Sequence, residues 1–119
     1  MSLPQPTIEA HVEAGTLVIR VSGYLNSRIG AEVGKVVDSL LDSGGRSVLL
    51  NFEGTRMMNS VGISSITSIV DRMSALEGRA AFCSLAGMNQ EIFRTMGATR
   101  GVRLFDTEAE ALVWFGSDE

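Results

Sequence analysis

The sequence has little of the chemistry from which most enzyme active sites are built. Its 119 residues include one His, one Cys and one Tyr, which leaves no group of imidazoles or thiols for a metal site or a Cys–His nucleophilic pair. His11 lies on the polar side of an expected strand, and Cys83 lies in the apolar run 80–85. We interpret His11 as a solvated side chain and Cys83 as a small core residue. We therefore expect no catalytic residues, no metal and no cofactor, and a protein that is not an enzyme.

Disulfides, basic clusters and long apolar runs are also missing. A single Cys cannot form an internal disulfide, and no basic and apolar secretory leader opens the chain, so we expect a cytoplasmic protein. Ten Lys and Arg against fourteen Asp and Glu give a net charge of −4, and the basic residues are scattered, which argues against nucleic-acid binding. No apolar run approaches the roughly eighteen residues that span a bilayer, so we expect no membrane insertion.

What the sequence does contain is the composition of one folded domain. Hydrophobic residues make up 45% of the chain and charged residues 20%, which is ordinary for a globular protein. A chain of this length can bury a core without disulfides or metal ions. We expect a single domain over residues 1–119, with its core between about residue 8 and residue 115.

Hydrophobic periodicity predicts the element order ββαβαβαβα. Two alternating segments around the turn pair Ala14–Gly15 predict a hairpin, and the later strands and helices alternate, which is typical of parallel strands. We expect an α/β fold in which this antiparallel hairpin joins parallel strands in a mixed five-stranded sheet with about four helices. The expected elements are strands at 8–12, 17–21, 48–50, 80–85 and 102–105, and helices at about 27–43, 61–76, 90–96 and 108–115. The expected helix caps are Asn26 or Ser27, Ser60 or the position beside it, Asn89 and Thr107.

The segment 51–63 carries the most information about function. It leads from the predicted central strand to the second helix, where Ser60 falls at or beside the N-cap. The unpaired N–H groups and positive dipole end there favour an oxygen atom, and favour a phosphate more. A phosphate would add roughly −1.5 to −2 charges to a nearly uncharged surface. Ser60 is therefore a candidate phosphorylation switch; the alternative is a serine that only caps the helix.

The element order, together with Met58-Asn59-Ser60-Val61-Gly62-Ile63, resembles the STAS domain family of the anti-sigma factor antagonist type. The resemblance covers about Ile8 to Phe115. It implies a regulatory binding module, which in its unphosphorylated form binds an anti-sigma factor with serine kinase activity and so releases a sigma factor. Phosphorylation of Ser60 would end this binding, and a serine phosphatase would restore it. The kinase, not this protein, would hold ATP.

Two positions depart from the family pattern. Asn51 and Asn59 are amides where family members often have Asp, so the segment is less acidic than usual. A lower negative charge makes a phosphate on Ser60 easier to accommodate, but it also removes carboxylates that a kinase could recognise. Val61 stands where a small hydroxylated residue is common, which leaves Ser60 as the best-placed acceptor of the segment.

We expect the partner to contact the surface around Ser60. The outward side of the second helix is small and hydroxylated, and two loop methionines supply adaptable apolar area. The predicted partner-binding residues are Met57, Met58, Asn59, Val61, Gly62, Ser64, Ser65 and Ser68. The alternative is a solvated helix face with both methionines in the core.

Two other hypotheses remain open on the sequence. The first keeps the STAS-like fold but makes the chain a constitutive subunit of a larger assembly, such as a stress-signalling scaffold or a lipid-transport complex, that phosphorylation does not regulate. The second is a small enzyme or nucleotide binder. The sequence offers little for the second, because it has no Gly-rich phosphate loop with a lysine.

Overall fold

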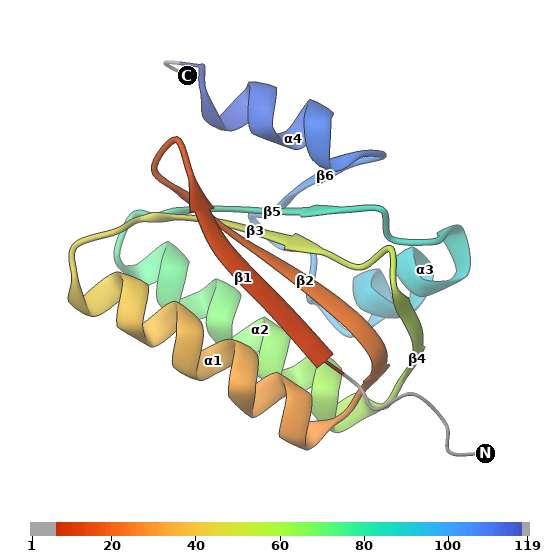
Figure 1. Cartoon of the computed structure of the whole chain (residues 1–119). Helices are drawn as coiled ribbons and strands as arrows, with labels where there is room; N and C mark the ends of the chain where they lie inside the picture. Colours follow the sequence, from red (N-terminus) through yellow and green to blue (C-terminus); the bar gives the residue numbers. More distant parts are fainter. Residues whose placement is uncertain (1–6, 118–119) are drawn as a thin grey trace.

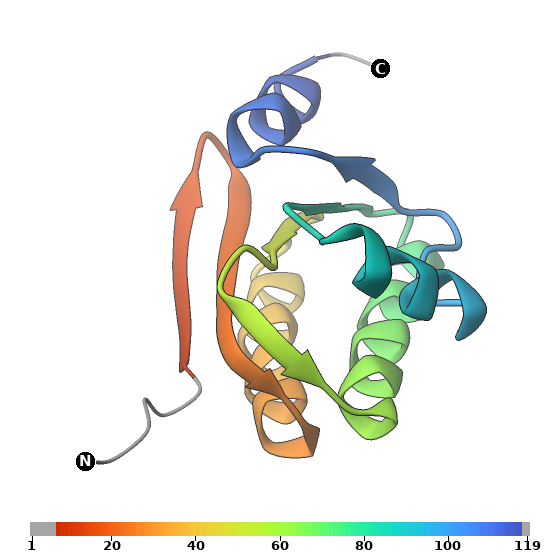
Figure 2. The ribbon, with the colours of Figure 1, turned by 90° about the vertical axis from the view of Figure 1, so that its right-hand side faces the viewer.

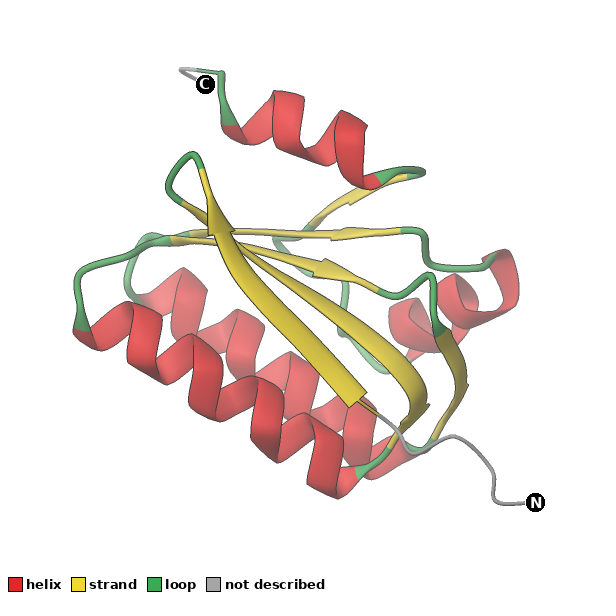
Figure 3. Ribbon diagram, in the orientation of Figure 1, coloured by secondary structure: helices red, strands yellow, loops and turns green. Residues whose placement is uncertain are grey.

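The chain forms a mixed sheet with helices on both faces (Figures 1 and 3). A computed structural model describes residues 7–117; the predicted domain limits at residues 1 and 119 lie outside them. The strands are β1 (Thr7–Glu13), β2 (Thr16–Leu25), β3 (Ser47–Asn51), β4 (Thr55–Met58), β5 (Arg79–Cys83) and β6 (Arg103–Phe105). The helices are α1 (Ser27–Asp42), α2 (Ser60–Ala75), α3 (Gly87–Thr95) and α4 (Glu108–Phe115). Among residues 7–117, no helix is both long and apolar enough to cross a membrane.

The strand order is β1-β2-β3-β5-β6, and β4 pairs with β2 outside this path. β1 and β2 pair antiparallel, whereas every other pairing is parallel. The predicted mixed sheet is confirmed, and the predicted strands and helices follow one another in the predicted order. The sheet has six strands rather than the predicted five, and the additional strand, β4, lies in the segment that the sequence predicts to be a loop.

β4 extends the sheet beside the far end of β2. Residues 17–20 of β2 pair with β3, and residues 23–25 pair with β4, with a register shift after Gly23. Gly23 has a φ of +87°, which glycine adopts without steric cost, and its N–H donates to the carbonyl oxygen of Gly54 at 2.9 Å. Thr55 is buried and donates its hydroxyl to the carbonyl oxygen of Val21 at 2.8 Å. These contacts hold in place the strand that leads into α2.

Two apolar clusters cover the two faces of the sheet. Side chains alternate along β3, so Val48 and Leu50 join the larger cluster with α1, α2 and α3, while Leu49 joins the smaller one under α4. Three aromatic rings, Phe52, Phe82 and Phe93, meet edge to face in the larger cluster, with centroids 5.2–5.6 Å apart. Because both faces of β3 are covered, its sequence is a continuous apolar run rather than an alternating one.

Cys83 lies in the smaller cluster, where it is fully buried. Burial raises the pKa of its thiol to about 11, so the reactive thiolate is disfavoured at neutral pH. The interpretation of Cys83 as a small core residue is therefore confirmed.

Two of the predicted N-cap residues are confirmed by the structure, and a third is wrong. Asn26 caps α1 by accepting the N–H of Ile29 at 3.0 Å, and Thr107 caps α4 by accepting the N–H of Glu110 at 3.2 Å. The prediction that Asn89 caps the third helix is wrong, because α3 already begins at Gly87 and its N-cap is Ala86. Ala86 has no side-chain acceptor, so no capping signal marks this start in the sequence.

α1 and α2 lie side by side on the same face of the sheet and run in the same direction (Figure 2). They approach closely at Gly30, where an added Cβ would come within 2.5 Å of the Ser65 Cβ. Farther along, Arg72 and Asp38 form an ion pair at 3.1 Å. The N-termini of the two helices therefore lie at the same end of the molecule.

Candidate functional site

The start of α2 is built by Asn59 rather than by Ser60. The Oδ1 of Asn59 accepts the N–H of Gly62 at 2.8 Å, and its own N–H donates to the carbonyl oxygen of Leu25 at 3.1 Å. Asn59 therefore satisfies one of the free N–H groups of the helix and also anchors the helix to the end of β2. Ser60 takes the next position, the first residue of α2.

The Ser60 side chain takes no part in holding the helix. Ser60 is exposed, and its hydroxyl has no hydrogen-bond partner among residues 7–117. Ser60 thus takes the second of its two predicted placements, the position beside the N-cap, and the alternative in which it only caps the helix is wrong, because Asn59 already supplies that oxygen. The hydroxyl is free for other chemistry at the positive end of a helix.

Gly62 allows α2 to approach the end of β2 very closely. An added Cβ would lie 2.3 Å from the carbonyl oxygen of Leu25 and 3.0 Å from the amide nitrogen of Asn26, and both of these are backbone atoms. No side chain fits there without moving the helix or the strand. Gly62 is buried, so it positions the site and offers no surface to a partner.

Two large apolar side chains are exposed on either side of Ser60. Met57 at the end of β4 is 62% exposed and Val61 in the first turn of α2 is 55% exposed. Isolated exposed apolar residues are common, but these two flank Ser60 in the sequence, and exposed Met and other large apolar side chains are typical of protein interfaces. Ser64 and Ser68 are exposed on later turns of the same helix. We call Met57, Ser60, Val61, Ser64 and Ser68 the partner surface.

The other predicted partner residues are only partly accessible. Met58 is half-buried and packs against the larger apolar cluster. Ser65 is half-buried beside Gly30 and donates its hydroxyl to the carbonyl oxygen of Val61 at 3.1 Å. Asn59 is half-buried as the helix cap. The structure therefore brings four of the eight predicted residues onto the exposed partner surface beside Ser60.

The electrostatic environment of Ser60 lacks nearby acidic side chains on its own helix. Neither α1 nor α2 has an acidic residue in its first turn, and the adjoining strand β4 contributes the exposed Arg56. The partial positive charge of each helix N-terminus is therefore not neutralised locally. A phosphate on Ser60 would meet a favourable field on the protein side.

Asn51 does not belong to this site. It is 5% exposed, and its side chain accepts the N–H of Glu53 at 2.8 Å and donates to Glu108 Oε1 at 3.0 Å. Glu108 is the first residue of α4, which covers the face of the sheet opposite to α2 (Figure 3). Of the two amides that depart from the family pattern, Asn59 directly precedes Ser60, whereas the side chain of Asn51 is bound to Glu53 and Glu108.

An ion pair that no sequence pattern predicts links α4 to the sheet. Arg20 donates through Nε and Nη2 to the two carboxylate oxygens of Glu108, at 3.0 and 2.8 Å. This hydrogen-bonded pair, with help from Asn51, lowers the pKa of Glu108 to about 2. In the sequence, Arg20 stands out as a charged residue within the apolar segment 17–21, but its partner Glu108 lies 88 positions farther along the chain.

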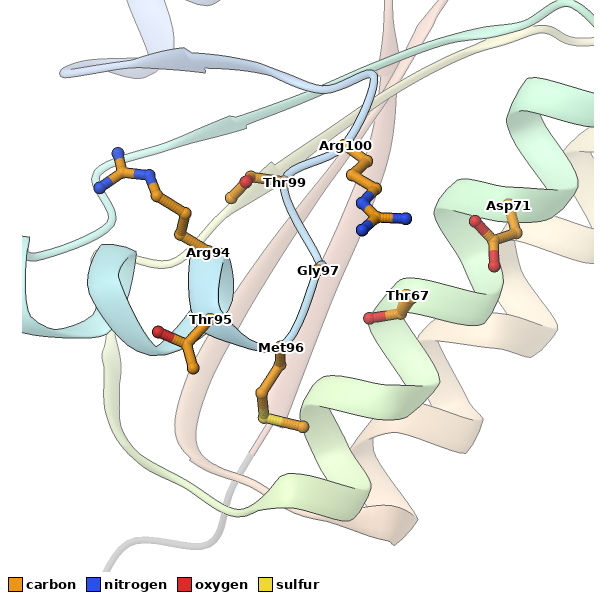
Figure 4. A pocket seen from close by; sticks show the side chains of 8 residues that line it. All are labelled: Thr67, Asp71, Arg94, Thr95, Met96, Gly97, Thr99 and Arg100. Carbon is orange, nitrogen blue, oxygen red and sulfur yellow. The ribbon is translucent and has the colours of Figure 1, made fainter.

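An open groove separates α2 from the chain between α3 and β6 (Figure 4). Its volume is about 500 Å³, and its walls are formed by Thr67, Asp71, Arg94, Thr95, Met96, Gly97, Thr99 and Arg100. None of these residues is buried, and Arg94 is already paired with Glu91 at 2.6 Å. The groove therefore lacks the enclosed set of polar groups that orients a small-molecule ligand.

Residues 7–111 match the STAS domain family, and the chain belongs to this family. One solved structure with the same fold is TM1081 from Thermotoga maritima, which is described as a candidate anti-sigma factor antagonist. Its sequence is 19% identical to this chain, the match covers 90% of this chain and 92% of TM1081, and the TM-score is 0.79. SpoIIAA, an anti-sigma factor antagonist, matches in its unphosphorylated form with 20% identity, 93% and 96% coverage and a TM-score of 0.72. The phosphorylated form of the Bacillus cell fate determinant SpoIIAA matches with 21% identity, 93% and 99% coverage and a TM-score of 0.73. At these identities the likeness establishes the fold.

Proposed function

We propose that this protein is a cytoplasmic anti-sigma factor antagonist whose binding to an anti-sigma factor is switched off by phosphorylation of Ser60. The observation that carries the proposal is the exposed Ser60 hydroxyl, which makes no hydrogen bond within residues 7–117 and stands between the exposed Met57 and Val61. Family membership and the fold shared with SpoIIAA, which is solved with and without phosphate, support it.

The partner surface suits a regulated rather than a permanent contact. Met57 and Val61 supply apolar area that a partner covers, and the serines of α2 supply hydroxyl groups around it. A phosphate on Ser60 would place roughly −1.5 to −2 charges between the two apolar side chains, and that charge loses its hydration when the interface closes. Phosphorylation therefore opposes partner binding through desolvation and through repulsion by any carboxylate on the partner.

The same phosphate does not unfold the protein. It lies at the N-terminus of α2, where a negative charge contributes roughly 0.3–1 kcal/mol of stability, and the groups that fix the helix start belong to Asn59 and Gly62. The switch thus changes the surface while the fold persists. In this proposal the partner anti-sigma factor is the serine kinase and holds ATP, a serine phosphatase restores the hydroxyl, and the chain itself performs no catalysis.

Affinity capture from the native host tests the proposal, with the wild type, Ser60→Ala and Ser60→Asp as baits. We expect an ATP-binding serine kinase to be recovered with the wild type and with Ser60→Ala and to be lost with Ser60→Asp. Ser74→Asp is the matched control, because Ser74 is exposed on the last turns of the same helix, far from its N-terminus in the sequence. It adds the same charge and should leave the captured partner unchanged.

Two results would contradict the switch. Recovery of the same partners with all four baits would indicate a constitutive subunit of a larger assembly. Loss of the partner with Ser60→Asp and Ser74→Asp alike would indicate a general effect of charge. Incubation of the captured kinase with ATP and the wild-type protein, followed by mass spectrometry of the peptide that contains Ser60, tests the modified position directly.

A further inference from the structure

β1 forms an edge of the sheet. In Figure 2 it is the outermost strand on one side, and among residues 7–117 no strand or helix lies beyond it. Six of its seven residues are exposed, and all seven pair with β2 without a register shift. The strand contains no Pro, no Lys and no bulge, three devices that commonly prevent an edge strand from pairing with another chain; its charged side chains are Glu9 and Glu13.

The hairpin turn determines which backbone groups of β1 face outward. Ala14 and Gly15 have φ values of +49° and +82°, as in a two-residue type I′ turn, and Glu13 pairs with Thr16 across it. In such a turn the flanking pair is hydrogen-bonded, and hydrogen-bonded and non-hydrogen-bonded pairs then alternate along the ladder. The N–H and C=O groups of Glu13, His11, Glu9 and Thr7 therefore point toward β2, and those of Ile8, Ala10 and Val12 point away from the sheet.

The side chains of β1 divide between the two faces. Ile8, Ala10 and Val12 lie on the face that carries the larger apolar cluster, which Ile8 contacts, and Val12 is 62% exposed. The opposite face carries Glu9 and His11, with Glu9 3.9 Å from Arg20 of β2 and His11 3.3 Å from Glu13. One face of the strand is therefore apolar, and the other carries carboxylates and an imidazole.

We propose that β1 pairs antiparallel with β1 of a second copy of this chain, about a two-fold axis through Ala10. In this register Ile8 lies opposite Val12 of the second copy and Ala10 opposite its equivalent, and these are the residues whose backbone groups face outward. Each such pair exchanges two N–H···O bonds. The exposed Val12 is then covered by Ile8 of the second copy, and Glu9 faces His11 across the interface, where an imidazole N–H donates to the carboxylate.

The charges distinguish this register from its neighbours. A two-fold axis at residue 9 places Glu9 opposite its own equivalent, and an axis at residue 11 places Glu9 opposite Glu13. Like charges directly opposite one another destabilise a ladder. The axis at Ala10 avoids both contacts and also pairs all seven residues of the strand, so the sequence of β1 is self-complementary in this register alone among the three.

Sedimentation equilibrium of the full chain tests the proposal. We expect the wild type to show a concentration-dependent monomer–dimer equilibrium. Ala10→Pro removes an outward N–H that β2 does not use, so the monomer should fold normally while the dimer is lost. His11→Glu places two carboxylates opposite each other at two symmetry-related positions, and we expect the dissociation constant to rise about tenfold, which corresponds to 1.4 kcal/mol.

A charge exchange separates this pairing from general effects of charge. Glu9→His/His11→Glu keeps the composition of the chain and restores the opposed Glu–His pairs, so dimerisation should return to near the wild-type level. Val113→Glu is the control, because Val113 is 77% exposed on α4 and should leave the dimer intact. A wild type that remains monomeric at roughly 1 mM, a dimer unaffected by Ala10→Pro, or a dimer abolished by Val113→Glu would each overturn the proposal.

Discussion

Replacing Glu108 by Gln measures how strongly the ion pair with Arg20 holds α4 on the sheet. The substitution keeps the shape of the side chain and leaves an oxygen that can accept from Asn51, but it removes the charge that pairs with the guanidinium. The pKa of Glu108 is lowered from 4.5 to about 2 by its hydrogen bonds with Arg20 and then with Asn51. Because each pKa unit corresponds to about 1.4 kcal/mol, the upper limit of the stabilisation is ~3.4 kcal/mol.

Exposure to water reduces this limit. The Arg20 side chain is 45% exposed and that of Glu108 is 22% exposed, so the pair is partly screened by solvent. We expect Glu108→Gln to lower the free energy of unfolding by about 1–2 kcal/mol at pH 7. A lowered pKa means that the folded protein binds the proton more weakly than the unfolded chain. The stabilisation is therefore complete above pH 4.5 and is lost as the pH falls to about 2.

Urea unfolding of both proteins at pH 7, 5 and 3 provides the measurement. The difference between them should be largest at pH 7 and should shrink steadily below pH 4.5. Glu110→Gln is the matched control, since Glu110 also lies in the first turn of α4 but is exposed and makes no ion pair within residues 7–117. It should lose only the dipole contribution of about 0.3–1 kcal/mol. Equal losses in the two variants, or a Glu108→Gln deficit that does not change with pH, would refute this reasoning.

Four further substitutions, at three positions, test the site and the hairpin by urea denaturation. Gly62→Ala places a methyl group 2.3 Å from the carbonyl oxygen of Leu25 and should cost about 2–3 kcal/mol; a neutral result would mean that α2 does not need this approach. Asn59→Ala removes the cap and should cost about 1 kcal/mol, whereas Asn59→Asp keeps the acceptor and should cost nothing. Ala14→Gly relieves the positive φ of +49° at this position and should raise the free energy of unfolding by about 0.5–1 kcal/mol. A loss of stability would contradict the assigned turn.

The order of the elements could be predicted because each carries a local signal. α1 and α4 begin at capping residues and continue with apolar residues at helical spacing, and β3 is a buried apolar run between polar ends. β4 could not be predicted from its own residues, because its four residues include an exposed Arg and an exposed Met. Its pairing also depends on the bulge at Gly23, which lies 32 positions before Thr55. Strand pairing at such separations is a tertiary property that no local pattern records.

The sequence predicts the place of the site more accurately than it predicts the role of each residue in it. The segment around Ser60 follows from the loop motif, but the cap belongs to Asn59, because both neighbouring residues have capping side chains and only the backbone geometry decides between them. The placement of Asn51 could not be read from its position near the segment, since one residue along a strand changes the face. Arg20 and Glu108 meet only through the docking of α4.

The carbonyl oxygen of Leu25 receives the Asn59 N–H and lies against Gly62, so the start of α2 is held in register by main-chain atoms on either side of Ser60. The position of Ser60 is thus independent of the identity of its own side chain. Serine, threonine, alanine, aspartate or a phosphorylated residue would all be presented at the same point and in the same orientation of the backbone. Phosphorylation or mutation of Ser60 can therefore change the side-chain chemistry at this point of the surface without changing the backbone that presents it.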